Sequence, residues 1–165
     1  MNYYAQTEHI PPTLAPPGLD MVLPFKAVAF GNLGLDSFIY DLIALFCKGG
    51  GTFKTITIVT NRIKSKCFDE LKGKGIIVLP CVHNLRPLQR FNEKEPHLIV
   101  FDDNTYYPEH INQVRDNFIR GRYHNISVLV AAPQYYVIDS MTRGVSNYLF
   151  ALSSCNKRDN TLMLK

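Results

Sequence analysis

The chain has 165 residues, of which 46% are hydrophobic and 19% are charged, and its formal net charge is +4. This composition is typical of a globular protein and excludes a disordered or collagen-like chain, and the length suits one domain with its own core. The small basic excess is compatible with nucleic acid as a partner but is far from that of a histone-like protein.

Cysteine spacing and apolar runs indicate the compartment. The four cysteines show no CxxC pairing, so we expect reduced thiols in an intracellular protein. No apolar stretch approaches the ~20 residues that cross a bilayer, and the polar start MNYYAQTEHIPP does not have the pattern of a signal peptide. We therefore expect no membrane insertion and no secretion.

The chain divides into a short segment and a domain. Residues 1–24 are rich in proline and lack apolar periodicity, which predicts an extended arm, either disordered or laid over a neighbour. In residues 25–165, short apolar runs alternate with amphipathic stretches. The apolar runs predict strands at 26–30, 55–60, 76–80, 97–103, 126–133 and 145–152. The amphipathic stretches predict helices at 36–46, 63–73 and 108–120.

The pattern of the strands predicts the fold class. They are continuously apolar rather than alternating, which indicates that both sheet faces are covered. Strands that alternate with helices favour a parallel sheet between helical layers. We predict an α/β domain of three layers with a central, mostly parallel sheet.

The stretch GNLGLDSF, residues 31–38, joins the first strand to the first helix, where many proteins hold the phosphates of a nucleotide. A working phosphate loop, GxxxxGK[ST], supplies backbone N–H groups, a lysine for the phosphate charge and a hydroxyl for Mg²⁺. Laid over this pattern, Gly31 fits the first glycine, but Asp36, Ser37 and Phe38 replace the second glycine, the lysine and the hydroxyl. Asp36 or Ser37 is instead a favoured N-cap, and a plain turn from strand to helix remains an alternative.

Polar residues end two later strands. Asp102 and Asp103 close the strand HLIVFDD, and such a pair can bind Mg²⁺ through water (Asp102) and act as general base (Asp103). Gln134 follows the strand ISVLVAAP and could orient a water near a γ-phosphate. The alternative in each case is an ordinary solvated loop.

Arginines and lysines add further candidates. Arg122 follows a helix end, Arg143 lies beyond Gln134, and an arginine that reaches across a subunit interface can stabilise a transferring phosphoryl group. Lys54 in GGGTFKT precedes a strand rather than a helix, so we reject it as the lysine of a phosphate loop. The helix expected at 63–73 and its flank carry four lysines that would either grip DNA or form a solvated face: Lys64, Lys66, Lys72 and Lys74.

The order of the segments VFDD, GRYHNISVLV, APQYY and RGVSN closely resembles that of the viral genome-packaging ATPases of the poxvirus type, in the FtsK–HerA superfamily of P-loop ATPases. The resemblance covers roughly residues 25–165 and is strongest from Pro96 to Phe150. It implies a P-loop NTPase-like domain that uses ATP and Mg²⁺ in a homo-oligomeric ring. It also implies viral duplex DNA and capsid or packaging proteins as partners, in the host cytoplasm or the virion.

The resemblance assigns catalytic or metal-binding roles to five residues: Asp102, Asp103, Gln134, Arg122 and Arg143. We call residues 31–38 the glycine turn. By the resemblance, Gly31 and Gly34 keep only the shape of a phosphate loop, and Asp36 and Ser37 belong to the same degenerate loop.

Three functions follow from the sequence. Because the lysine and the hydroxyl of the phosphate loop are missing, we expect a packaging-type ATPase whose hydrolysis is impaired or lost. The alternatives are an inactive module that binds DNA or protein for assembly, and an α/β interaction domain of other ancestry. The ATPase hypotheses expect the glycine turn and the two acids at one end of the sheet, with Phe30 and Phe101 on neighbouring strands.

Overall fold

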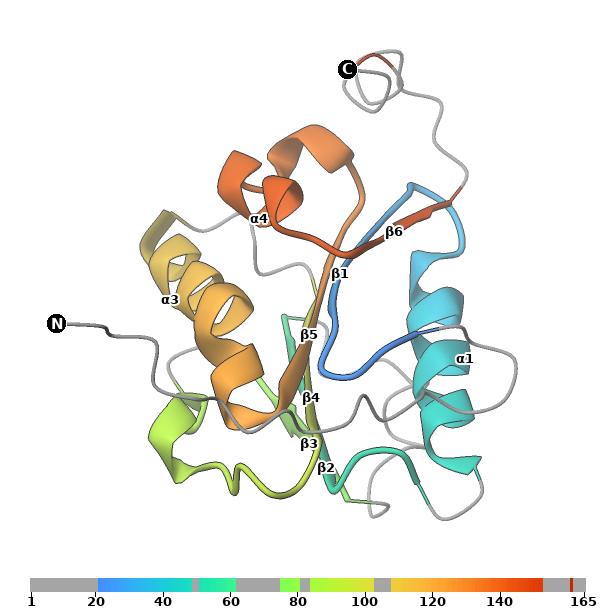
Figure 1. The fold of residues 1–165 in the computed structure, drawn as a ribbon. Coiled ribbons are helices and arrows are strands. Elements are labelled where there is room, and N and C mark those ends of the chain that lie inside the picture. Colours follow the sequence, from blue (N-terminus) through green and yellow to red (C-terminus); the bar gives the residue numbers. More distant parts are fainter. Residues whose placement is uncertain are drawn as a thin grey trace, which may run out of the picture.

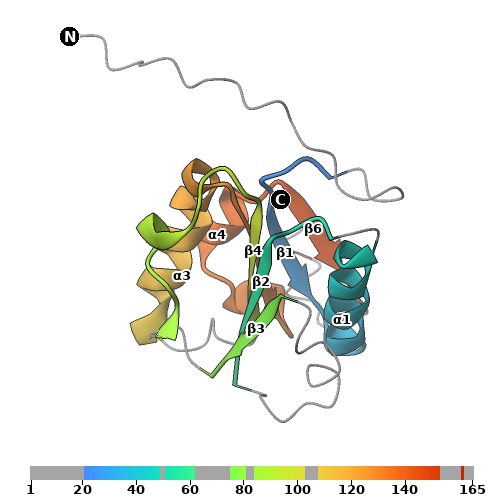
Figure 2. The ribbon, with the colours of Figure 1, turned by 90° about the horizontal axis from the view of Figure 1, so that it is seen from below.

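The computed structural model describes residues 21–48, 51–61, 75–80, 84–102, 108–152 and residue 161. A central sheet separates two helical layers, with α1 on one face and α3 and α4 on the other (Figures 1 and 2). The strands are β1 (Lys26–Phe30), β2 (Thr55–Thr60), β3 (Ile76–Leu79), β4 (His97–Asp102), β5 (Ile126–Ala132) and β6 (Tyr148–Ala151). The α-helices are α1 (Leu35–Phe46), α3 (Pro108–Arg120) and α4 (Ser140–Gly144), and the 3₁₀ helices are η3 (Leu88–Arg90), η5 (Gly121–His124) and η6 (Tyr135–Val137).

The six described strands form one sheet in the order β3-β2-β4-β5-β1-β6, and every pairing in it is parallel. The predicted three-layer α/β architecture with a central parallel sheet is thereby confirmed. The six predicted strands are all present, although β6 begins at Tyr148 rather than at 145, because the Val145 and Ser146 amides donate to carbonyls of α4. The helix expected at 63–73 lies outside the described residues.

The two faces of the sheet bury two apolar clusters. On the α1 side, Ile39 and Phe46 of the helix pack in one cluster with Ala29 of β1 and Leu129 of β5. The opposite face has a second cluster. There Phe118 of α3 packs with the strand residues whose side chains point away from α1. Since side chains of a strand alternate between the two faces, two buried faces explain why the strand sequences are apolar without interruption.

The end of the proline-rich segment joins the domain. Met21 and Leu23 are buried in the cluster on the α1 side, and the Val22 amide donates a hydrogen bond to the Tyr148 hydroxyl at 2.9 Å. Residues 21–24 therefore pack against the sheet, while the rest of the expected arm lies outside the described residues. Within the described ranges, no helix is long and apolar enough to span a bilayer.

An ion pair ties α4 to α3. The Arg115 guanidinium donates to both carboxylate oxygens of Asp139, at 2.7 and 3.3 Å. The same carboxylate caps α4 by accepting a hydrogen bond from the Thr142 amide at 3.1 Å. These donors stabilise the charged form, so Arg115 lowers the pKa of the Asp139 carboxyl below its ordinary value.

This double role predicts a graded loss of stability. Asp139→Ala removes both the cap and the ion pair, so it should reduce the free energy of unfolding by about 1 kcal/mol or more. Asp139→Asn should cost less, because asparagine still accepts the hydrogen bond of an N-cap. Urea unfolding of the two variants measures the difference, and equal losses would show that the cap adds nothing.

Candidate functional site

Three segments far apart in the sequence end at the carboxyl edge of the sheet. Phe30 of β1 pairs with Ala132 of β5, and Asp102 of β4 pairs with Ala131 on the other side of the same strand. The Gly31 amide continues the first ladder by donating to the Ala132 carbonyl at 3.3 Å. The glycine turn, the end of β5 and Asp102 are therefore collected along one edge.

The expected neighbour relation is wrong, however. Phe30 and Phe101 lie on strands that are not adjacent, because β5 is inserted between β1 and β4. The glycine turn is therefore two inter-strand spacings from the end of β4, a distance of about 10 Å. The acid and the turn share an edge, with the end of β5 between their strands.

The turn itself is short and is shaped by glycine. Gly34 has a φ of 78°, a left-handed conformation that L side chains rarely adopt, and it is the N-cap of α1. The helix therefore begins at Leu35, and Asp36 and Ser37 lie in its first turn. The prediction that Asp36 or Ser37 is the N-cap is wrong, because the left-handed glycine makes the turn and no side chain caps the helix. Asp36 still places its negative charge near the positive end of the helix dipole.

Packing accounts for two other residues of the pattern. A Cβ atom at Gly31 would lie 2.5 Å from the Cβ of Leu152, the residue that follows β6 and donates its amide to the Phe30 carbonyl. Phe38 packs its ring on that of Phe150 with centroids 5.0 Å apart. Both positions thus serve the contact between the turn, α1 and β6.

A pocket of about 300 Å³ lies between the turn, the first turn of α1 and Pro133. Among the described residues that line it, none is a lysine or an arginine, whereas Asp36 contributes a carboxylate. Among the described lining residues, a phosphate group there would meet backbone amides and a negative side chain, with no cation to offset the repulsion. These described residues do not fit the triphosphate of a nucleotide.

Asp102 is fully buried at the end of β4. Its carboxylate accepts a hydrogen bond from the Thr60 hydroxyl of β2 at 2.8 Å. Because Val100 and Ile58, two residues back on each strand, pack in the cluster with α1, this pair also lies on the α1 side of the sheet. The sequence did not single out Thr60, although its position at the end of a neighbouring apolar strand was the available signal. Asp103 lies outside the described residues.

The other predicted residues lie apart from this pair. Gln134 is half-buried just after β5. Arg143 of α4 lies over the ring of Tyr135, 4.9 Å from its centroid, and Tyr135 packs on Phe30 on the face of the sheet opposite to α1. Arg122 is in η5, just before β5 begins, and so belongs to the amino edge. Within one chain, the structure does not bring Arg122 to Asp102.

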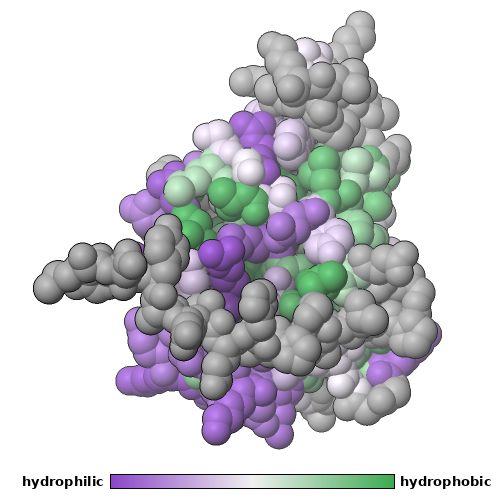
Figure 3. All heavy atoms as spheres, in the orientation of Figure 1, coloured by the Kyte–Doolittle hydropathy of each residue, from purple (hydrophilic) through white to green (hydrophobic). Residues whose placement is uncertain are grey.

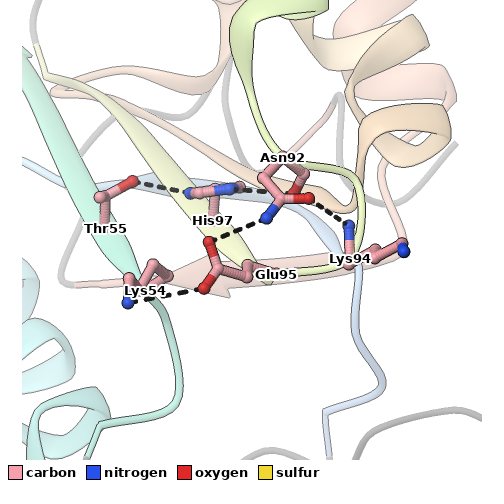
Figure 4. A network of polar contacts seen from close by, with 6 residues as sticks. All are labelled: Lys54, Thr55, Asn92, Lys94, Glu95 and His97. Atoms are coloured by element: carbon pink, nitrogen blue, oxygen red, sulfur yellow. Dashed lines mark hydrogen bonds and ion pairs between the residues drawn. The ribbon is translucent and has the colours of Figure 1, made fainter.

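A polar network occupies the amino edge of β2 and β4 (Figure 4). His97 contacts the Thr55 hydroxyl through Nδ1 at 2.7 Å and the Asn92 carbonyl through Nε2 at 3.2 Å. Glu95 bridges this group to Lys54 at 3.5 Å. Burial of the imidazole lowers the pKa of His97. The network gives both nitrogens of the neutral His97 ring a hydrogen-bond partner. Lys54, rejected above as a phosphate-loop residue, forms the outer end of this network.

No metal centre is evident in the part of the chain that the structure describes, where no three side chains of His, Cys, Asp or Glu form a cluster. Comparison with protein-family models and with curated protein sequences gives no match for this chain. The class that the structure defines is a three-layer α/β domain with an all-parallel sheet in its described part.

The close approach at Gly31 predicts a cost for any side chain there. Gly31→Ala should lower the free energy of unfolding by about 1–3 kcal/mol, because the new methyl group overlaps Leu152. Gly144→Ala is the matched control, since its Cβ would meet nothing within 4 Å. Chemical denaturation compares them, and a Gly31→Ala protein as stable as the control would contradict the packing role.

The buried imidazole predicts a dependence of stability on pH. Since the pKa of His97 is lower in the folded chain than its ordinary value near 6.5, the unfolded chain takes up the proton first and stability falls as pH drops below about 6.5. His97→Gln should remove this part of the pH dependence. His124→Gln, at a half-buried histidine paired with Glu93, should keep it. Urea midpoints at about pH 7.5 and 5 test this, and parallel curves for wild type and His97→Gln would refute it.

Proposed function

We propose that this chain is a domain of the viral genome-packaging ATPase type that has lost ATP hydrolysis and serves as a binding or assembly module. The order of its motifs carries the lineage, and the common carboxyl edge of the glycine turn, Gln134 and Asp102 supports it. The insertion of β5 between the turn and the acid removes the direct neighbour relation. The lineage therefore depends chiefly on the motifs.

The pocket at the glycine turn is the observation that carries the loss of hydrolysis. It is lined by Asp36 and Ser37 where a charge clamp would be needed, and Phe38 is engaged with Phe150. Each preorganised group removed from a reacting centre costs a factor of about 10²–10³ in rate. With two such groups absent, little turnover would remain.

The partners in this proposal are those of a packaging assembly. Viral duplex DNA, capsid or packaging proteins, and further copies of the chain in a ring are the candidates. In such a ring, Arg122 or Arg143 would reach toward the glycine turn of a neighbouring subunit, the place that a nucleotide takes in an active packaging ATPase. An α/β interaction domain of other ancestry would have the same fold, but it would not gain ATP binding when the residues of a phosphate loop are restored in the turn.

Titration with ATP and Mg²⁺ tests the proposal. We expect binding weaker than about 1 mM and no hydrolysis, because the pocket offers a carboxylate instead of a cation. Micromolar affinity with turnover would reject the loss of function. Isothermal titration and release of inorganic phosphate are the two measurements.

Repair of the turn distinguishes a decayed nucleotide site from an ordinary turn. Asp36→Gly, Ser37→Lys and Phe38→Thr together should restore measurable ATP binding if residues 31–38 descend from a phosphate loop. Because Phe38 packs on Phe150, the double variant Asp36→Gly and Ser37→Lys is the control that keeps this contact. If both repaired proteins fold and neither binds ATP, the alignment with a phosphate loop is wrong.

A further inference from the structure

Two cations from distant parts of the sequence meet at the amino edge of β1 and β5. Lys26 opens β1 opposite Val128, and Arg122 lies in η5, whose chain turns at Asn125 directly into β5. The Asn125 amide donates to the Arg122 carbonyl at 3.3 Å, which closes this turn. Parallel pairing of β1 with β5 therefore brings Lys26 and Arg122 to one place.

Neither cation has an acidic partner among the described residues. The neighbouring arginines differ in this respect: Arg120 pairs with Asp116 at 3.0 Å, and Arg115 pairs with Asp139. Burial and the charge of Arg122 together lower the pKa of Lys26. Two positive charges that repel each other without a counter-charge favour an anion between or beside them.

An aromatic side chain stands next to these cations. Tyr123 is 59% exposed, which leaves much of its ring accessible. The Arg122 guanidinium lies 4.8 Å from the ring centroid and donates to the Tyr123 hydroxyl at 2.8 Å. This contact orients the ring and lowers the pKa of the Tyr123 phenol. On the face drawn in Figure 3, hydrophilic residues gather at the lower left of the molecule.

We propose that Lys26, Arg122 and Tyr123, the amino-edge cluster, bind single-stranded nucleic acid. An exposed ring stacks on a base only where the base is not already stacked within a duplex, and adjacent cations hold the phosphates. Lys26 and Arg122 supply the phosphate contacts, and Tyr123 supplies the stacking platform. The cluster is at the sheet edge opposite to the glycine turn, so this inference does not depend on the proposed function.

The chemistry favours this occupant over an acidic peptide. An acidic peptide would satisfy Lys26 and Arg122 but would leave the exposed ring of Tyr123 without a flat partner. A nucleotide offers both an anion and a π-face at adjacent positions. Duplex DNA offers the anion alone.

Fluorescence anisotropy with a labelled oligothymidylate of about 12 nucleotides tests the proposal on the full chain. Lys26→Gln and Arg122→Gln should each weaken binding and reduce the slope of log K against log salt by about 0.7, the value for one phosphate contact on a single strand. Arg120→Gln is the matched control, because its guanidinium is held by Asp116, and it should leave both quantities unchanged.

The ring is tested by a pair of variants. Tyr123→Leu should weaken binding about tenfold or more at every salt concentration with the slope unchanged, since stacking does not release counterions. Tyr123→Phe should keep most of the affinity, because it keeps the π-face. Circular dichroism confirms that each exposed substitution leaves the fold intact.

Four results would overturn the inference. These are the absence of binding at low salt, unchanged affinity of Tyr123→Leu, an effect of Arg120→Gln equal to that of Arg122→Gln, and equal competition by a duplex or by polyglutamate. ATP titration is a separate measurement on the opposite edge, so failure of the nucleotide hypothesis leaves this result unaffected.

Discussion

The hydrogen bonding of β5 to both β1 and β4 is the constraint on which the rest of the structure depends. All seven residues of β5 are buried, and the strand holds its two neighbours in register along nearly its whole length. Parallel ladders align carboxyl ends with carboxyl ends, so the glycine turn, Gln134 and Asp102 share one edge. The same strand also keeps the turn and the acid about 10 Å apart. They share an edge without lying on neighbouring strands.

The residues of the glycine turn have packing roles of their own. Gly31 is needed because Leu152 approaches its Cα, and Gly34 because its φ is left-handed. Phe38 fills the space against Phe150. A strand, a glycine turn and a helix therefore persist here for structural reasons, while Asp36 makes the pocket unfavourable for phosphate.

The two edges of the sheet differ in charge and partners. At the carboxyl edge, the described charged side chains include a buried carboxylate with its hydroxyl donor and a second carboxylate that lines the pocket. At the amino edge, Lys26 and Arg122 lie together beside an exposed ring, and no described acidic side chain pairs with them. Since every described strand runs in the same direction, residues that precede strands are gathered at one edge and residues that follow them at the other.

The sequence by itself determined the six described strands, the helices α1 and α3 and the layering of this protein, because the uninterrupted apolar runs and the helical spacing are local and have few alternative structures. It did not predict α4, and the helix expected at 63–73 lies outside the described residues. It also located Asp102 and the glycine turn at strand ends, but not Thr60, whose role arises only when β2 pairs with β4. Only the tertiary structure decided that β5 separates Phe30 from Phe101, that Leu152 requires a glycine at position 31, and that Arg122 joins Lys26 at the far edge. Strand order and contacts between distant segments depend on which ladders form in the folded chain, and the periodicity of an individual segment carries no information about that choice.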